Sequence, residues 1–155
     1  DFARSQPCRR HGRRALQNTW PNALVVTCSG ALLLQERPWD RPGVPGGLNL
    51  FGGHVEAGET PLQGLIRELR EELGAMVAPA DVVPLGAVTE SWTGHVEVVH
   101  LHVWRDIQGS ITGCYEWRAR AFASAQEVLA RADLMDYARW TIAACVDRGL
   151  LPLGS

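Results

Sequence analysis

The chain of 155 residues contains no lysine, and all fifteen of its basic residues are arginines. This absence excludes a phosphate-binding loop that depends on lysine and any mechanism that forms a Schiff base on a lysine amine. The chain also lacks an excess of positive charge, because its formal net charge is −2. We therefore expect no strongly basic surface and no nucleic acid as a partner.

Cysteine and long apolar runs are scarce. The four cysteines stand far apart and form no Cys-x-x-Cys pair: Cys8, Cys28, Cys114 and Cys145. This spacing argues against a disulfide scaffold or a zinc knuckle and favours free thiols in a reducing cytosol. No apolar run approaches the ~18 residues that a membrane span requires, and no signal-peptide pattern is visible. We expect a cytoplasmic protein without a membrane-spanning segment.

The first 22 residues differ in composition from the rest of the chain. Five arginines fall here, with almost no apolar periodicity before Ala15 and Leu16. We interpret residues 1–22 as an arginine-rich arm, either loosely attached or swapped between the two copies of a homodimer. Residues 23–150 are then expected to form one domain, because a chain with 46% apolar residues and this length suits a single core.

The pattern along residues 23–150 mixes strands with helices. Two apolar runs within 23–38 flank the turn pair Ser29-Gly30 and predict a hairpin. A loop rich in proline and glycine follows at 38–47. Further strands are predicted at 48–53, 81–91, 95–104 and 118–123, and helices at 61–73, 124–131 and 134–148. Strands and helices mixed around one core predict an α/β sandwich.

The helix at 61–73 has the clearest boundaries. Thr60 suits the N-cap, Pro61 suits the first helical position, and Gln63 completes a capping box with Thr60. Gly74 is the expected C-terminal stop.

On a helical wheel, five apolar side chains form one stripe of this helix, and Glu68, Glu71 and Glu72 form an arc beside it. Arg67 and Arg70 lie on the other flank. Glu68 and Glu72 are an i,i+4 pair of like charges, which costs roughly 0.2–0.5 kcal/mol. Two explanations remain open on this geometry alone. The arc is either a solvated helix face or an oxygen-rich site for a hard divalent cation.

The segment from Gly53 to Ala75 resembles the Nudix box, Gly-x5-Glu-x7-Arg-Glu-U-x-Glu-Glu-x-Gly-U, in which U is a bulky aliphatic residue. The seven fixed positions are filled by Gly53, Glu59, Arg67, Glu68, Glu71, Glu72 and Gly74, and Leu69 fills the first U. Ala75 departs from the last U, and Phe51 stands where many members have proline before the glycines. The resemblance implies a Nudix-type α/β/α sandwich with a mixed sheet.

The resemblance also implies a chemistry, which is hydrolysis of a nucleoside diphosphate linked to another group, with Mg²⁺ or Mn²⁺. Glu71 and Glu72 match the core metal ligands, Glu68 matches a ligand or base, and the Gly52 carbonyl matches a backbone ligand. Arg67 matches the arginine that holds a box glutamate in place, and Glu59 matches a supporting carboxylate.

Some members of the family carry a further glutamate beyond the box, and two residues here are candidates. Glu116 stands six residues before Phe122, which resembles the MutT-type pattern, and we favour it over Glu97 in the strand at 95–104. Trp39 and Arg41, in the loop at 38–47, are our candidates for substrate binding.

The resemblance favours a MutT-type nucleoside triphosphate pyrophosphohydrolase, because marks of other subgroups are absent. ADP-ribose relatives often have proline where Glu90-Ser91 stand, and dinucleoside polyphosphate relatives tend to have tyrosine near Trp92-Thr93. The alternatives are an ADP-ribose or nucleotide-sugar pyrophosphatase and a sensor that binds a nucleotide without turnover.

Overall fold

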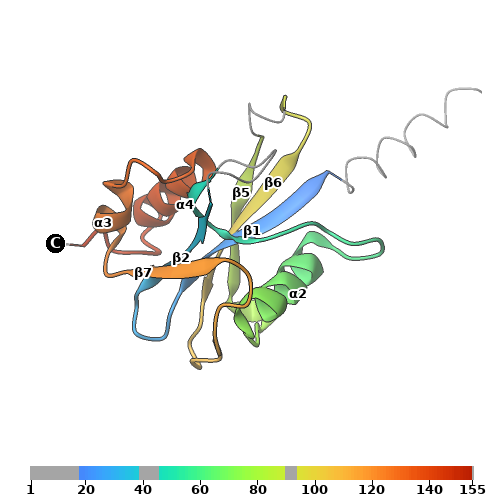
Figure 1. Ribbon diagram of the computed structural model, residues 1–155, viewed down its shortest axis with the longest axis horizontal. Coiled ribbons are helices and arrows are strands. Elements are labelled where there is room, and N and C mark those ends of the chain that lie inside the picture. The colour runs from blue at the N-terminus through green and yellow to red at the C-terminus, as the bar shows by residue number, and fades with distance from the viewer. Residues whose placement is uncertain (1–17, 39–45, 90–93, 155) are drawn as a thin grey trace, which may run out of the picture.

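The computed structural model describes residues 18–38, 46–89 and 94–154. Seven strands of this part of the chain form one mixed sheet, in the order β3-β2-β1-β6-β5, with β4 beside β1 and β7 beside β2 (Figure 1). The strands are β1 Thr19–Val26, β2 Leu32–Arg37, β3 Gly47–Asn49, β4 Phe51–Gly52, β5 Val82–Thr89, β6 Val98–Arg105 and β7 Arg118–Phe122. The helices are α2 Pro61–Leu73, the 3-10 turn η1 Pro79–Asp81, α3 Ala125–Leu129 and α4 Asp136–Asp147.

Helices cover both faces of the sheet. On one face the leucines of α2 pack with Ala23, Phe51 and Trp104. On the other face α3 and α4 pack over a larger core that includes Leu24 and Leu101. Alternate residues of β1 enter the two cores because side chains along a strand point to opposite faces. This arrangement confirms the predicted α/β/α sandwich with a mixed sheet (Figure 1).

The central strand β1 begins earlier than the sequence predicted. It starts at Thr19 instead of residue 23, and it runs parallel to β6 from Thr19↔Val98 to Val26↔Arg105. The added segment contains Pro21, which has no N–H to donate to a sheet ladder. The structure uses its carbonyl instead, which accepts a hydrogen bond from the Gly53 N–H (3.2 Å).

The single strand predicted at 48–53 is two strands in the structure. β3 pairs with β2, whereas β4 pairs with β1 in the register Ala23↔Phe51. The chain therefore changes partner at Leu50, whose side chain is fully buried. This change brings Gly52 to the middle of the sheet, directly under α2. The remaining predicted elements are confirmed with small differences at their ends.

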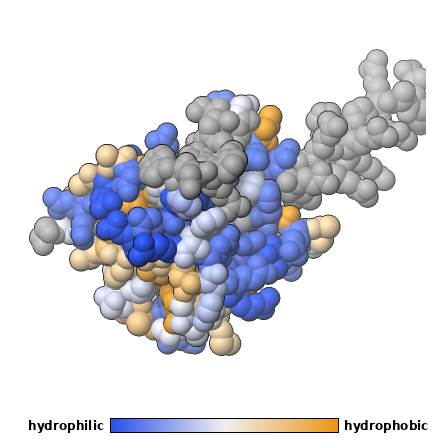
Figure 2. Space-filling model, in the orientation of Figure 1, coloured by the Kyte–Doolittle hydropathy of each residue, from blue (hydrophilic) through white to orange (hydrophobic). Residues whose placement is uncertain are grey.

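The outward face of α2 is polar. Hydrophilic residues gather over this helix in the space-filling view (Figure 2). Among the described residues, no helix has the length and apolar character needed to cross a bilayer.

Candidate functional site

Helix α2 is fixed at both ends by the residues that the sequence indicated. The Thr60 hydroxyl accepts from the Gln63 N–H (3.2 Å), and the Gln63 carbonyl oxygen Oε1 accepts from the Thr60 N–H (2.9 Å). Gly74 ends the helix in the left-handed region, with φ 63°. These local contacts set which residues of α2 face the sheet.

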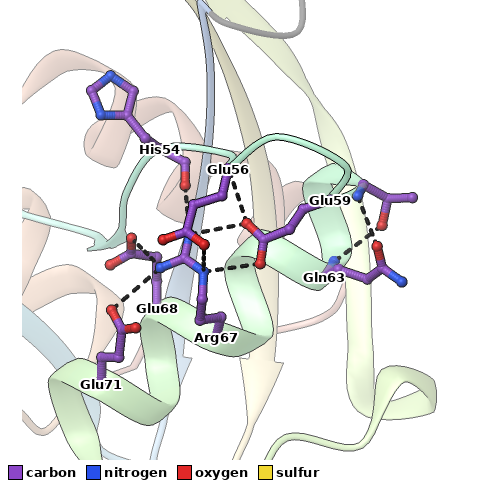
Figure 3. Close-up of polar contacts among 8 residues, drawn as sticks. His54, Glu56, Glu59, Gln63, Arg67, Glu68 and Glu71 are labelled. Carbon is purple, nitrogen blue, oxygen red and sulfur yellow. Dashed lines mark hydrogen bonds and ion pairs between the residues drawn. The ribbon is translucent and has the colours of Figure 1, made fainter.

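Arg67 is the centre of a polar cluster on the outer side of α2 (Figure 3). Its guanidinium donates twice to Glu59, from Nε (2.9 Å) and Nη2 (3.1 Å). Nη1 donates to Glu68 (2.9 Å) and to Glu71 (3.3 Å), and Nη2 also donates to the His54 carbonyl (2.8 Å). One guanidinium thus ties the loop before α2 to two of its glutamates.

The charged groups in this cluster shift one another's pKa values. The hydrogen bond to Glu59 is the largest cause that raises the pKa of Arg67, and the same bond lowers the pKa of Glu59. For Glu68 burial dominates and raises the pKa, although Arg67 opposes that shift. A bidentate arginine–carboxylate pair fixes geometry as well as charge, so Glu59 sets the orientation in which Arg67 reaches the helix.

Glu72, one helical turn after Glu68, lies against the sheet. Only 2% of the residue is exposed, and its Oε2 accepts from the Gly52 N–H (3.1 Å). Burial raises the pKa of this carboxyl to about 9, and the charges of Glu116 and Glu68 add to the shift. In the absence of a cation, the buried carboxyl is therefore protonated at neutral pH.

Gly53 makes room for Glu68. A Cβ built at residue 53 would lie 2.5 Å from the Glu68 Cδ and 2.6 Å from its Oε1. Any larger residue at this position would push the carboxylate away from the backbone beside Gly52. The glycine therefore keeps Glu68 close to both Gly52 and Glu72.

The structure separates the two candidates for the remote carboxylate. Glu116 interacts with Glu72 and contributes to the raised pKa of both Glu72 and Glu68. Glu97 instead lies near His54, where its charge opposes the lowering of the histidine pKa by burial. The ring of that histidine stacks on Trp20, with centroids 3.3 Å apart.

A divalent cation is compatible with the donors that this region holds. The predicted ligands supply only oxygen atoms: the Gly52 carbonyl and the carboxylates of Glu68, Glu71 and Glu72. Oxygen donors are those that Mg²⁺ prefers, and a cation would relieve the mutual repulsion recorded in the raised pKa of Glu72.

The three carboxylates do not converge as the helical wheel suggested. Within the ranges that the structure describes, no three His, Cys, Asp or Glu side chains are already grouped for metal binding. Glu72 is buried, whereas the side chain of Glu71 is 57% exposed and bonds to Arg67. The wheel places residues on an arc but does not show that Arg67 holds two of the three.

The two predicted substrate-binding residues lie outside the part of the chain that the structure describes, and three residues that contact α2 were not predicted from the sequence. Trp39 and Arg41 fall outside the described residues. His54 was not predicted, because it accepts the hydrogen bond from Arg67 through its backbone carbonyl, and every residue type has such a carbonyl. Thr112 and Tyr115 were not predicted either, although both bond to the last residues of α2.

The chain is similar in sequence and in fold to known proteins. A family model described as NUDIX domain matches residues 19–144. A CTP pyrophosphohydrolase of Escherichia coli strain K12 is 32% identical over 111 residues, which cover 69% of this chain and 76% of that protein. A nucleoside triphosphatase NudI of Escherichia coli strain SE11 is 44% identical over 60 residues, covering 39% of this chain and 43% of that protein. The crystal structure of a MutT protein from Methanosarcina mazei Go1 has a TM-score of 0.64 and 23% identity, and covers 85% of this chain and 94% of that chain.

Proposed function

Because the chain belongs to the NUDIX domain family of hydrolases, we propose that it is a metal-dependent pyrophosphohydrolase whose substrate is a nucleoside triphosphate. The observation that carries the proposal is the pairing of Glu116 with the buried Glu72, beside the full set of box glutamates. The similarity to a CTP pyrophosphohydrolase and to a nucleoside triphosphatase supports this choice of substrate class.

The residues that would hold Mg²⁺ or Mn²⁺ are Gly52, through its carbonyl, and Glu68, Glu71 and Glu72. When bound, the cation lowers the pKa of a water molecule and neutralises phosphate charge. As a ligand Glu72 would be a carboxylate, and the hydrogen bond that it accepts from the Gly52 N–H would orient it. Arg67, anchored by Glu59, holds Glu68 in place.

Glu116 is the residue that we propose as the general base. It is exposed to solvent, and it adjoins Glu72. Its carboxylate accepts a proton of the attacking water as the water oxygen bonds to phosphorus and the phosphoanhydride P–O bond to the leaving group breaks. The arginines of the chain are available to bind phosphate oxygens, because guanidinium groups form paired hydrogen bonds with them.

Two other functions make different use of the same site. An ADP-ribose or nucleotide-sugar pyrophosphatase would share the carboxylates and differ in what binds the leaving group. A sensor would bind a nucleotide without turnover, and such modules usually lose box glutamates, whereas Glu68, Glu71 and Glu72 are all present here. The intact set therefore favours an enzyme.

The test is a panel of nucleoside triphosphates, ADP-ribose and nucleotide sugars, incubated with the protein and Mg²⁺. We expect release of pyrophosphate and a nucleoside monophosphate from a triphosphate, and no turnover in EDTA. Preferred cleavage of ADP-ribose or a nucleotide sugar would replace the proposed substrate. Tight binding of a nucleotide without any product would instead support the sensor.

A matched pair of variants tests Glu116. Glu116→Gln should lower kcat at least ~10²-fold with little change in KM, because loss of a general base is felt in the transition state. Glu97→Gln, the control, should change kcat much less because Glu97 lies near His54. The reverse ranking would move the remote carboxylate to Glu97.

A further inference from the structure

We propose that residues 106–117, which we call the strap, dock on the C-terminal end of α2, and that Cys114 within the strap is a positioning residue for Glu116. The strap connects β6 to β7 and lies outside the box. The inference rests on the proposed function, since it concerns the carboxylate that we assign as the base.

The first half of the strap is anchored by a buried carboxylate. Asp106 is only 3% exposed, and its two oxygens accept from the backbone N–H groups of Ser110 (2.8 Å) and Ile111 (3.0 Å). The Ser110 hydroxyl in turn accepts from the N–H of Met76, just beyond α2 (3.0 Å). The turn at 106–111 is thus closed on itself and tied to the segment that leaves the helix.

The middle of the strap donates hydrogen bonds to the last backbone carbonyls of α2. The last carbonyls of a helix have no partner within the helix. Here the Thr112 N–H donates to the Leu73 carbonyl (2.9 Å), and the Tyr115 N–H donates to the Glu72 carbonyl (2.8 Å). The hydroxyls of Thr112 and Tyr115 lie 2.9 Å apart and close the strap over the helix end. Glu72 therefore contacts the strap through its backbone as well as its side chain.

Gly74 provides the space for this docking. A Cβ built at residue 74 would collide with the Thr112 hydroxyl and would lie 3.2 Å from the Tyr115 ring. The box glycine at this position thus has two roles. It ends the helix in the left-handed region, and it leaves the surface on which the strap lies.

Cys114 sets the conformation at the tip. Its thiol donates to the Glu116 carbonyl (3.1 Å) and lies 3.7 Å from the Trp117 carbonyl. Trp117 has φ 55°, a left-handed conformation that a bulky residue rarely adopts without support. The half-buried thiol therefore contacts the two backbone carbonyls that directly follow the Glu116 Cα, and the Glu116 side chain interacts with Glu72.

The experiment is a double-mutant cycle between residues 114 and 116. Cys114→Ala should lower kcat about tenfold with KM within about twofold, and Cys114→Ser should restore most of the loss because a hydroxyl can donate to the same carbonyls. In the Glu116→Gln background, Cys114→Ala should have almost no further effect, because the group that it positions is gone. Cys28→Ser, at an exposed cysteine in the turn after β1, is the control and should behave as the parent chain.

Hydrogen exchange gives a readout that does not depend on turnover. In the metal-free protein, Cys114→Ala should speed the exchange of the Thr112 and Tyr115 amides while leaving those within α2 unchanged. Thr112→Val, which removes the hydroxyl contact with Tyr115, should have the same effect and serves if Cys114→Ala folds poorly.

Distinct results would overturn the two proposals. If the parent chain hydrolyses none of the nucleotides, the proposed function is wrong. If the parent is active but Cys114→Ala matches it, or if the losses in the cycle simply add, Cys114 does not act through Glu116. Unchanged exchange at Thr112 and Tyr115 in both variants would show that these side chains do not hold the strap.

Discussion

Single residues of α2 have unequal environments although the sequence presents them as one acidic arc. Arg67 forms ion pairs with Glu68 and Glu71, whereas the buried Glu72 lies near Glu116 and forms no ion pair with an arginine among the described residues. Glu72 is therefore the carboxyl whose charge costs most in the metal-free protein, because burial without a cation penalises the ionised form.

Glu72→Gln should abolish most activity and leave the fold intact. The folded protein must keep the buried Glu72 carboxyl protonated, and a neutral amide of the same shape avoids that cost, so the free energy of unfolding in metal-free buffer should stay equal or rise. Urea unfolding and kcat measured on the same preparation check this. A clear loss of stability would instead make Glu72 a structural residue.

The pH dependence of stability follows from the same carboxyl. Its pKa in the folded protein is about 9 and its reference value is 4.5, so the folded state keeps a proton that the unfolded state releases in this range. Stability should then fall as pH rises from 7 to 8.5, by at most ~1.4 kcal/mol per pH unit. Urea titrations of the metal-free protein measure the slope, and Glu72→Gln should flatten it.

Between pH 7 and 8.5 the histidines contribute little to the slope of stability against pH. Burial lowers the pKa of His54 and His102 below 6.5, so their contribution to stability increases with pH and changes little above pH 7. The raised pKa values of Cys114 and Cys145 begin to lower stability only near the upper end of this window, because the unfolded thiols have a reference pKa of 9.0. A slope that persists in Glu72→Gln would have to come from another group.

At the scale of elements, α2 was predictable because its signals are local. Thr60, Gln63 and Gly74 act within a few residues, and the structure shows each of them in the predicted contact. The start of β1 and the partner change at Leu50 were not predictable, because both depend on pairing with strands elsewhere in the chain.

The candidate site likewise has a part that local sequence predicts and a part that depends on distant segments. The positions of the box residues follow from one helix and its preceding loop. The contact between Glu116 and Glu72 joins residues 44 apart in sequence, and the sequence could only rank Glu116 against Glu97. No local pattern could reveal the role of the His54 carbonyl.

Thr60→Ala should destabilise the protein by about 1 kcal/mol, because it leaves the Gln63 N–H without its cap. Glu59 and Arg67 should also be held less firmly in place, because the first turn of α2 directly follows the loop that carries Glu59. The midpoint of urea unfolding measures the effect. Thr60→Ser keeps the hydroxyl and should behave like the parent, and equal losses in both variants would refute the capping role.

At the scale of the whole molecule, cation binding should be visible as stability. Mg²⁺ or Mn²⁺ at about 100 times its dissociation constant would stabilise the fold by ~2.7 kcal/mol. For a domain of this size that is roughly a 5–10 °C rise in Tm. Calorimetry with MgCl₂, against NaCl at equal ionic strength, measures the rise. EDTA should reverse it, and a Tm that ignores divalent cations would argue against a metal site.

The parallel pairing of β1 with β6 has a kinetic consequence. Ala23 lies opposite His102, so the centre of the sheet closes only when segments about 80 residues apart meet. Such high contact order slows folding, because the entropy of a long loop is lost before the pairing stabilises it. On the ribosome, β1, β2 and α2 emerge well before β6 and β7. The nascent chain therefore exposes the apolar side of β1 until β6 has been synthesised, and the contact between Glu116 and Glu72 forms later still.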